Sequence, residues 1–217
     1  IRDLFVEDKI VYISLIHQTS KGISINVYNA DLSFKKLNFK IFFKNKSYWP
    51  TYNVYSGGRI AKYKDNKILF SIGHAAVLGA AQDMNSFLGK VISIDKSTKE
   101  VNIISMGHRN PQGLVYIEDS DIIINTEHGP KGGDEININF QSNNKDSIPN
   151  FGWDIASYGI EYDGTDPYKK SHSKYGFGEP FKYYVPSIGI SQLVYLPTNL
   201  NFNNEKHLFV SSLRAAS

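Results

Sequence analysis

Two polar segments on either side of a short apolar hairpin carry the residues with the clearest chemical potential. Segment 107–114 reads GHRNPQGL and segment 126–137 reads TEHGPKGGDEIN, with an expected turn at 118–120 between them. Loops rich in Arg, Asn, Gln, His, Gly and Pro at the ends of a hairpin are typical of a rigid scaffold that presents polar groups. A hairpin with ordinary loop residues is the alternative. Because two such motifs flank one hairpin, the sequence favours a functional site.

Arg109 is the first candidate within the earlier segment. Its guanidinium offers a planar fork of N–H donors that suits a carboxylate or a carbonyl-type oxygen, and Asn110 and Gln112 place amide donors beside it. In the competing interpretation, Arg109 pairs with a loop carboxylate and Asn110 closes the turn before Pro111. The donor set therefore predicts a ligand site, with a purely structural role as the alternative.

Composition bounds the class of protein. The chain has 217 residues, 41% of them hydrophobic, with no cysteine and a net charge of +3. These values suit one globular domain spanning 1–217 and exclude disulfide and thiolate chemistry. The mild, scattered positive charge argues against a nucleic-acid partner, and no apolar run approaches the roughly 20 residues that cross a bilayer. Since the chain begins at Ile1 rather than Met, we expect a processed or partial sequence.

The elements that must position these loops are strands, grouped into repeating units. Each unit opens with a short strand and turns into a second apolar strand, and the openers are centred on Leu4, Ile60, Leu114 and Leu193. A period of about 40–55 residues with four strands per unit is typical of propeller blades. Segment 141–186 is a long polar insertion, and 74–89 is a loop with room for one helical turn. The expected strands are 4–6, 10–16, 22–28, 37–43, 59–63, 67–73, 90–97, 101–107, 114–117, 121–125, 191–197 and 207–213.

A propeller arrangement would bring the polar segments together. Equivalent loops of all blades meet around one axis, so the loops before Ile60, before Leu114 and after Ile124 should converge. Four blades with this much irregular chain are unsuited to closing a ring. The sequence therefore predicts an all-β fold in which this chain is part of a larger propeller, covering roughly four blades of four antiparallel strands.

The motifs GHRNPQGL, EHGPKGGDEIN and NFGWD (150–154) together resemble the soluble quinoprotein glucose/sorbosone dehydrogenase family. SGGRI at 56–60 and VSSLR at 210–214 extend the resemblance over essentially the whole chain. It implies a six-bladed propeller, with a first blade and the end of the ring outside this sequence. It also implies oxidation of an aldose or related sugar, with hydride passing from C1 to pyrroloquinoline quinone (PQQ) in the presence of calcium. The implied location is periplasmic or secreted; the sugar, electron acceptor and oligomeric state are not indicated.

The resemblance also assigns roles to individual residues. Arg109, Asn110 and Gln112 face the cofactor, and Lys131 and Arg214 complete the expected cofactor-binding set. The backbone carbonyls of Gly129 and Pro130 match the corner that binds the PQQ-associated calcium, since calcium accepts main-chain oxygen ligands. Glu135 and the backbone of Phe151 match a second, structural calcium site, with Asp154 as the candidate for an additional carboxylate ligand. Solvated loop charge is the alternative for these acidic residues.

Departures from the family pattern fall on the catalytic base. The family places a His four residues before the Arg of GGR, and this chain has Tyr55 there. A neutral His can accept a proton from a sugar hydroxyl, whereas a phenol is a poor base at neutral pH. His74, where the family has an acidic and amide-bearing corner, is the second candidate, although the sequence favours an ordinary loop role for it. Arg109 would steady negative charge during the reaction.

These departures support a runner-up from a different functional class. It is a non-catalytic β-propeller that retains the fold and the calcium loops and binds a carbohydrate or protein partner. Three further histidines, His17, His172 and His207, lack partners at ligand spacing and are expected at the surface or at strand edges. Trp49 and Trp153 are candidates for sugar stacking, with core packing as the commoner fate of tryptophan.

Overall fold

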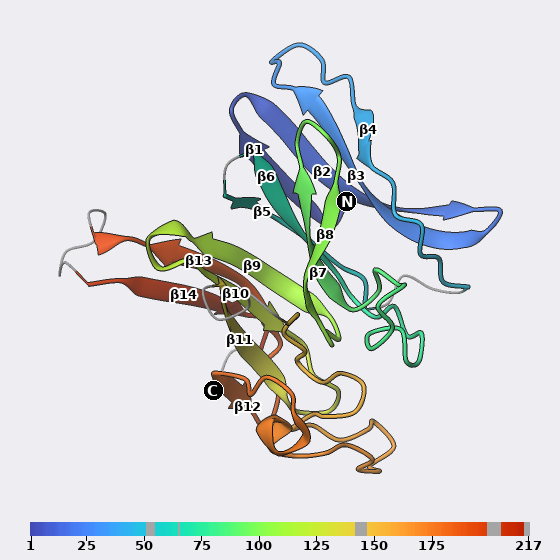
Figure 1. Cartoon of the computed structure of the whole chain (residues 1–217), viewed down its shortest axis with the longest axis vertical. Helices are drawn as coiled ribbons and strands as arrows, with labels where there is room; N and C mark the ends of the chain where they lie inside the picture. The colour runs from blue at the N-terminus through green and yellow to red at the C-terminus, as the bar shows by residue number, and fades with distance from the viewer. Residues whose placement is uncertain (51–54, 65, 142–146, 199–204, 215–217) are drawn as a thin grey trace.

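The protein is built from strands, joined by turns and by one long irregular segment (Figure 1). The structure is a computed structural model that describes residues 1–50, 55–64, 66–141, 147–198 and 205–214. No helix in these ranges is long and apolar enough to cross a membrane. The strands are β1 (Asp3–Glu7), β2 (Ile10–Thr19), β3 (Gly22–Asp31), β4 (Lys40–Phe43), β5 (Gly57–Tyr63), β6 (Lys67–Ile72), β7 (Lys90–Asp95), β8 (Val101–Met106), β9 (Pro111–Ile117), β10 (Ile122–Glu127), β11 (Asp134–Phe140), β12 (Lys182–Tyr184), β13 (Ile190–Leu196) and β14 (His207–Ser212).

The strands form antiparallel sheets in simple sequence order. Three sheets have four strands each, β1-β2-β3-β4, β5-β6-β7-β8 and β9-β10-β11-β12, and a fourth contains β13 and β14 within the described residues. The first strand of each sheet packs against the first strand of the next, so β1 meets β5, β5 meets β9 and β9 meets β13. Successive sheets with their first strands side by side are the arrangement of propeller blades. The predicted all-β fold and its blade order are confirmed.

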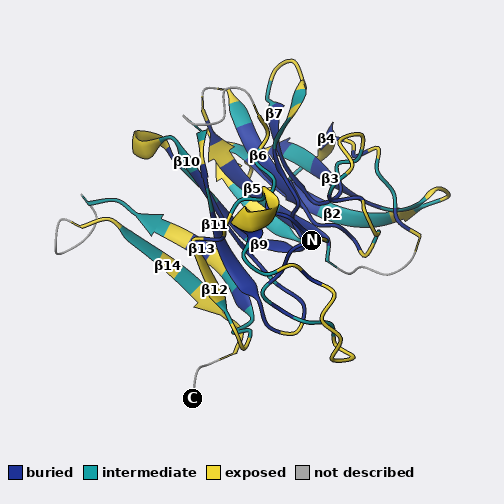
Figure 2. Ribbon diagram, turned by 60° about the horizontal axis from the view of Figure 1, so that its bottom comes forward, coloured by how far each residue is buried: buried dark blue, intermediate teal, exposed yellow. Residues whose placement is uncertain are grey.

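Strand β6 shows why these segments are apolar on both faces. Ile68, Phe70 and Ile72 point into a core shared with the first sheet. Leu69, on the opposite face, joins a second core that includes Leu114 and other residues of the third sheet. Fully burying each such side chain contributes about 1.5–3 kcal/mol, so adjacent blades stabilise each other through the strand between them. Figure 2 shows this buried interior along β6, β7 and β9–β11, with exposed residues at the outer turns.

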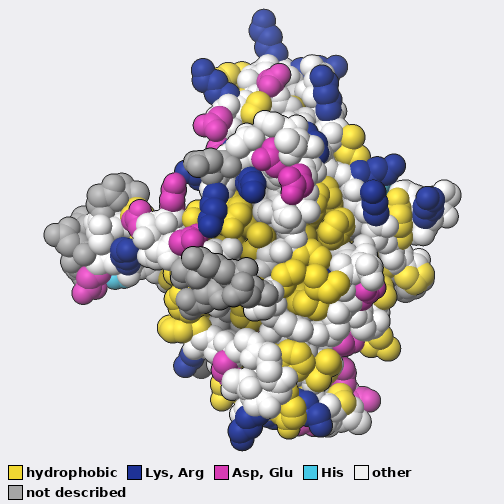
Figure 3. All heavy atoms as spheres, viewed as in Figure 1, with side chains coloured by type: hydrophobic (Ala, Val, Ile, Leu, Met, Phe, Trp, Pro, Cys, Tyr) yellow, Lys and Arg dark blue, Asp and Glu magenta, His cyan; other side chains and the backbone are white. Residues whose placement is uncertain are grey.

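Charged side chains occupy the periphery. On the face seen in Figure 3, Lys and Arg are interspersed with Asp and Glu around a more hydrophobic middle. The outer hairpin turns carry ion pairs of this kind, such as Lys62 with Glu118 at 3.2 Å. Exposed pairs of this type contribute little to stability, so the fold depends on the cores between the sheets.

The structure departs from the sequence expectation in three places. The predicted turn at Glu118–Ser120 is present as a short 3-10 turn. The polar segment 126–137 was not predicted to contain a strand, but β11 begins within it. Strand β12 likewise lies inside the predicted insertion. Segment 74–89 consists of turns and contains no helix among its described residues. The third sheet is therefore completed by chain that the hydrophobic pattern alone did not identify.

Lys90 holds the turns of segment 74–89 in place from beneath. It is fully buried at the start of β7, and its Nζ donates hydrogen bonds of 2.9 Å to the carbonyls of Ala80, Ala81 and Leu88. Burial lowers the pKa of Lys90 to about 8, which leaves the ammonium form predominant at pH 7. The Ala81 carbonyl also accepts from the Gly107 N–H at 3.1 Å. Lys90 therefore supports both this loop and the start of the 107–114 motif.

We expect Lys90→Met to destabilise the protein by about 2–4 kcal/mol, because three buried carbonyls would lose their donor. The matched control is Lys62→Met in the same sheet, whose side chain is 58% exposed. Chemical denaturation at pH 7 measures both free energies of unfolding. Equal, small losses in the two variants would contradict a structural role for the buried ammonium.

Candidate active site

Four loops that are distant in sequence are joined by backbone hydrogen bonds at one end of the sheets. The Ala75 N–H donates to the Tyr55 carbonyl at 3.0 Å, and the His74 N–H donates to the Arg109 carbonyl at 2.9 Å. The His128 N–H donates to the Asn110 carbonyl at 3.2 Å. The predicted convergence of the loops before Ile60, before Leu114 and after Ile124 is therefore observed.

The backbone is strained where the first two loops meet. Tyr55, Ala75 and Ala76 have φ angles of 48°, 54° and 57°, a left-handed region that residues with a side chain rarely adopt. Gly73 is required between them, since a Cβ there would lie 1.9 Å from the Tyr55 carbonyl oxygen. Such strain persists only where the surroundings enforce it, and it concentrates at functional sites.

Arg109 lies at the centre of the joined loops and is 4% exposed. Its Cζ lies 4.3 Å from the ring centroid of Tyr55 and 5.1 Å from that of Trp153. Its Nη1 donates to the carbonyl of His128 at 3.1 Å and to that of Gly129 at 2.6 Å. The cation predicted for the cofactor and the corner predicted for calcium are thus in direct contact.

A buried carboxylate fixes the backbone of Arg109. Glu127, at the end of β10, accepts from the Arg109 N–H at 2.6 Å, from Asn137 Nδ2 at 2.8 Å and from Asn125 Nδ2 at 3.2 Å. Its Oε1 also lies 2.9 Å from Nδ1 of the fully buried His108. Burial opposes ionisation of Glu127, but His108 and the donors outweigh it, so the pKa of this carboxyl lies below its ordinary value. Glu127 is therefore an ionised, fully engaged anchor.

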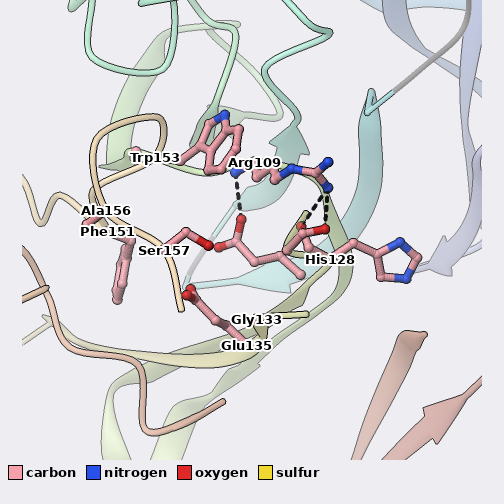
Figure 4. Close-up of a pocket in the computed structure, with 11 residues that line it drawn as sticks. Arg109, His128, Gly133, Glu135, Phe151, Trp153, Ala156 and Ser157 are labelled. Carbon is pink, nitrogen blue, oxygen red and sulfur yellow. Dashed lines mark hydrogen bonds between the residues drawn. The ribbon is translucent and has the colours of Figure 1, made fainter. Parts of the chain in front are cut away.

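Glu135, on the neighbouring strand β11, is in the opposite electrostatic situation. Burial, followed by the charge of Glu127, raises the pKa of Glu135 well above its ordinary range. The two carboxylates line a cavity of about 10 Å³, close to the volume that one water-sized sphere needs. Asn137 Oδ1 is buried nearby without a donor in the described part of the chain. Figure 4 shows Arg109, Glu135, Phe151, Trp153 and Ser157 gathered around this cavity.

His74 lines a second, larger cavity of about 280 Å³, together with Tyr55, Arg109, Trp153 and Tyr168. The His74 ring stacks on Tyr55 with centroids 5.3 Å apart and meets Trp153 edge to face at 5.2 Å. Burial, followed by the charge of Arg109, lowers the pKa of His74 to about 3. Neither of its ring nitrogens, nor Trp153 Nε1, has a hydrogen-bond partner among the described residues. Two aromatic side chains that line the cavity therefore carry buried nitrogens whose hydrogen bonds no described residue satisfies.

Among the other residues predicted to bind the cofactor, two form internal hydrogen bonds and two line a cavity. Asn110 Oδ1 accepts from the Gly57 N–H at 3.3 Å and from Gln112 Nε2 at 2.9 Å, so this pair braces the junction of β5 and β9. Lys131 and Arg214 instead line a third cavity of about 400 Å³. That cavity includes Gly129 and Pro130, and it shares Tyr162 with the cavity of His74.

His172 and the two tryptophans are placed by long-range contacts that the sequence did not predict. His172 is 1% exposed and stacks on Tyr158 with ring centroids 5.3 Å apart, so its expected surface position is wrong. Its Nε2 lies 3.6 Å from Glu135 Oε1, a proximity that sequence spacing could not reveal. Trp49 is buried in the core, whereas Trp153 lines the His74 cavity. Trp153 is thus the tryptophan that lines a cavity.

Comparisons with known proteins agree with this geometry. A sequence profile described as Glucose / Sorbosone dehydrogenase matches residues 1–217. An aldose sugar dehydrogenase of Escherichia coli is 29% identical over 198 residues, which cover 85% of this chain and 51% of that protein. The quinoprotein glucose dehydrogenase B of Acinetobacter calcoaceticus is 28% identical over 140 residues, covering 50% of this chain and 28% of that protein.

A solved structure shows the same fold. The crystal structure of the soluble aldose sugar dehydrogenase from Escherichia coli in its apo-form superposes with a TM-score of 0.81 at 25% identity, covering 96% of this chain and 63% of that chain. The chain spans about half the length of the Escherichia coli relative. Since the family profile covers every residue and the blades superpose, this chain belongs to the glucose/sorbosone dehydrogenase family of β-propellers.

Proposed function

We propose that the protein oxidises an aldose at C1 with PQQ and calcium, in the periplasm or outside the cell. The observation that carries this proposal is the cavity where Tyr55, His74, Arg109 and Trp153 meet, with the His74 nitrogens facing no protein partner. Membership of the dehydrogenase family and the printed names of its relatives, one of them a quinoprotein, support the same conclusion.

The chain offers suitable groups for a cofactor with three carboxylates. Lys131 and Arg214 line a cavity that adjoins the His74 cavity at Tyr162, and Arg109 lies buried beside the Gly129 carbonyl. Cationic donors of this kind form strong hydrogen bonds with carboxylates. When bound, PQQ would supply the quinone that accepts hydride from the sugar, and calcium would polarise it.

The donor set also fits calcium. The Gly129 carbonyl, predicted as a ligand, is engaged by Arg109 Nη1, but a carbonyl oxygen has a second lone pair. The small cavity beside Glu135 and Phe151 is lined by two buried carboxylates, whose mutual repulsion a divalent cation would relieve. Calcium prefers oxygen ligands of this type. We therefore assign Glu135 and the Phe151 backbone to a structural calcium site.

His74 is better placed than Tyr55 to act as the base. It lines the cavity, its nitrogens are unpartnered within the described residues, and its low pKa keeps the imidazole neutral at physiological pH. A neutral imidazole can accept the proton of the sugar hydroxyl. A pKa of about 3 makes it a weaker base than an ordinary histidine, so a ligand that contacts the His74 nitrogens must raise this pKa for efficient proton transfer. The Tyr55 ring stacks on both His74 and the Arg109 guanidinium, so it orients these groups.

We expect His74→Asn to lower kcat by about 10²–10⁴-fold, the usual contribution of a general base. PQQ affinity should change little, because Arg109, Lys131 and Arg214 remain. Tyr55→Phe keeps the stacked ring and should leave kcat within about threefold of the original. Steady-state assays with a redox dye measure the rates, and a PQQ titration measures cofactor binding.

The pH profile gives an independent check on the same assignment. A base whose pKa is about 3 stays unprotonated between pH 5 and 8, so the rate should not fall through that range because of His74. With a base of ordinary histidine pKa, the rate would fall below about pH 6.5.

The two variants also provide the contradicting outcome. If Tyr55→Phe lost turnover and His74→Asn kept it, the base would be Tyr55.

We expect calcium to stabilise the protein without PQQ, by about 2.7 kcal/mol at a concentration 100 times its Kd. Glu135→Gln should abolish this gain. Because the pKa of Glu135 is raised by folding, ionisation of this carboxyl destabilises the folded protein as pH rises above the ordinary pKa of glutamate. The Gln variant has no such ionisation, so without metal it should be at least as stable as the original protein above pH 5.

Thermal melts with calcium or a chelator test this expectation, and Glu100→Gln at an exposed position serves as the control. Equal calcium stabilisation of Glu135→Gln and the original protein would place the metal elsewhere.

A specific observation supports the non-catalytic alternative: the family's histidine position is held by Tyr55. Under that alternative, PQQ would bind tightly without any sugar turnover, or the cavity would bind a carbohydrate in the absence of PQQ. The assays above separate these outcomes from dehydrogenase activity.

A further inference from the structure

Residues 154–168 contribute a wall to the His74 cavity, and Asp154 is the one of them that belongs to a sequence motif. Asp154, Glu161, Tyr162 and Tyr168 all line this cavity. The segment is held against the motif loops by specific contacts: Asp154 Oδ2 accepts from the Gly79 N–H at 3.0 Å. The cavity therefore has a composite lining, with one side from the blade loops and the other from the insertion.

The two carboxylates give this wall a net negative charge. Asp154 and Glu161 are both partly exposed, and Glu161 accepts a hydrogen bond from the Tyr168 hydroxyl. Burial, followed by that hydrogen bond, raises the pKa of Tyr168, so its hydroxyl remains a donor. Neither carboxylate has an ion-pair partner among the described residues. Each retains an oxygen available to a ligand.

Arg109 offsets only part of this charge. Its guanidinium carries one positive charge and lies between the Tyr55 and Trp153 rings, with Nη1 donating to the carbonyls of His128 and Gly129. His74 is neutral at physiological pH. One guanidinium therefore faces two carboxylates, so the described lining of this cavity keeps one net negative charge.

The aromatic lining suits a ring-shaped ligand. Trp153 and Tyr168 lie with ring centroids 5.1 Å apart, and Tyr162, at 63% exposed, borders the opening. Aromatic faces attract cations as well as the apolar face of a sugar. His74 and Trp153 are each more than nine-tenths buried and have ring nitrogens without partners among the described residues, which points independently to a ligand in this cavity.

We propose that this cavity selects an amino sugar, an aldose carrying an ammonium group, over neutral and acidic aldoses of the same size. The proposal rests on the proposed dehydrogenase function and assigns its substrate class. The ammonium supplies hydrogen-bond donors to Asp154 and Glu161, whereas a sugar carboxylate at the same place is repelled by both. Asp154 and Glu161 are the specificity-determining residues.

The experiment compares D-glucosamine, D-glucose, N-acetyl-D-glucosamine and D-glucuronate with the PQQ- and calcium-loaded protein. We expect kcat/KM for glucosamine to exceed that for glucose by about tenfold and that for glucuronate by more, given a charge pair in a partly screened site. The N-acetyl sugar removes the charge, so it should lose the advantage. Asp154→Asn with Glu161→Gln should equalise glucosamine and glucose.

The matched control is Asp163→Asn, in the same segment but outside the lining of the cavity, which should leave the ranking unchanged. Calorimetric titration of each sugar into the protein gives a readout that does not need turnover. Oxidation of glucose at least as efficient as that of glucosamine, with a ranking insensitive to Asp154 and Glu161, overturns the substrate assignment and leaves the dehydrogenase function intact.

Binding and turnover together distinguish failure of the amino-sugar site from failure of the dehydrogenase function. Glucosamine binding that depends on both carboxylates, without oxidation of any sugar, supports the amino-sugar site and overturns the dehydrogenase function. Absence of both binding and oxidation in the folded protein overturns both.

Discussion

The buried carboxylate of Glu127 is the constraint on which the site depends. It accepts hydrogen bonds from the Arg109 backbone and from the side chains of Asn125 and Asn137, and it pairs with His108. A buried charge is tolerated only when it is fully engaged, so these partners cannot move independently. Fixing the Arg109 backbone sets the direction of its side chain, which then reaches Gly129 and two aromatic rings.

The blades supply the geometry around that anchor. The strands of the second and third sheets are covered on both faces by neighbouring sheets, which fixes the sheet order and leaves polar groups at the loops. Joining the loops takes close backbone approach, seen at Gly73 and the left-handed Tyr55. The site therefore depends on the relative placement of the second and third sheets more than on any single loop.

Much of the fold followed from the hydrophobic pattern, because each second strand, β2, β6, β10 and β14, is a short apolar run. Strand β11 escaped notice since Asp134, Glu135 and Asn137 make it read as a polar loop, although all three are buried. The motif residues Arg109 and Gly129 were placed together correctly. Asn110 and Gln112, however, are hydrogen-bonded to each other. Their spacing in the sequence does not predict this pairing.

The cavity wall from segment 141–186 was not predictable by the same route. That segment has no sustained periodicity, and its contacts, such as Asp154 with Gly79, are long-range. His172 shows the same limit: nothing local marks it as buried, and its neighbour Glu135 comes from another part of the sheet. Contacts between residues distant in sequence, rather than local propensity, determine these positions.

The most direct test of the account is a PQQ titration of the purified protein in calcium, followed through intrinsic tryptophan fluorescence, with Arg109→Met in parallel. The account predicts saturable binding of one PQQ per chain in the original protein and a loss of affinity in the variant of about a hundredfold, because a buried charge-assisted contact with the cofactor disappears. A folded protein that binds no PQQ, or a variant that binds it equally well, would contradict the claim that the loops around Arg109 form a quinone cofactor site.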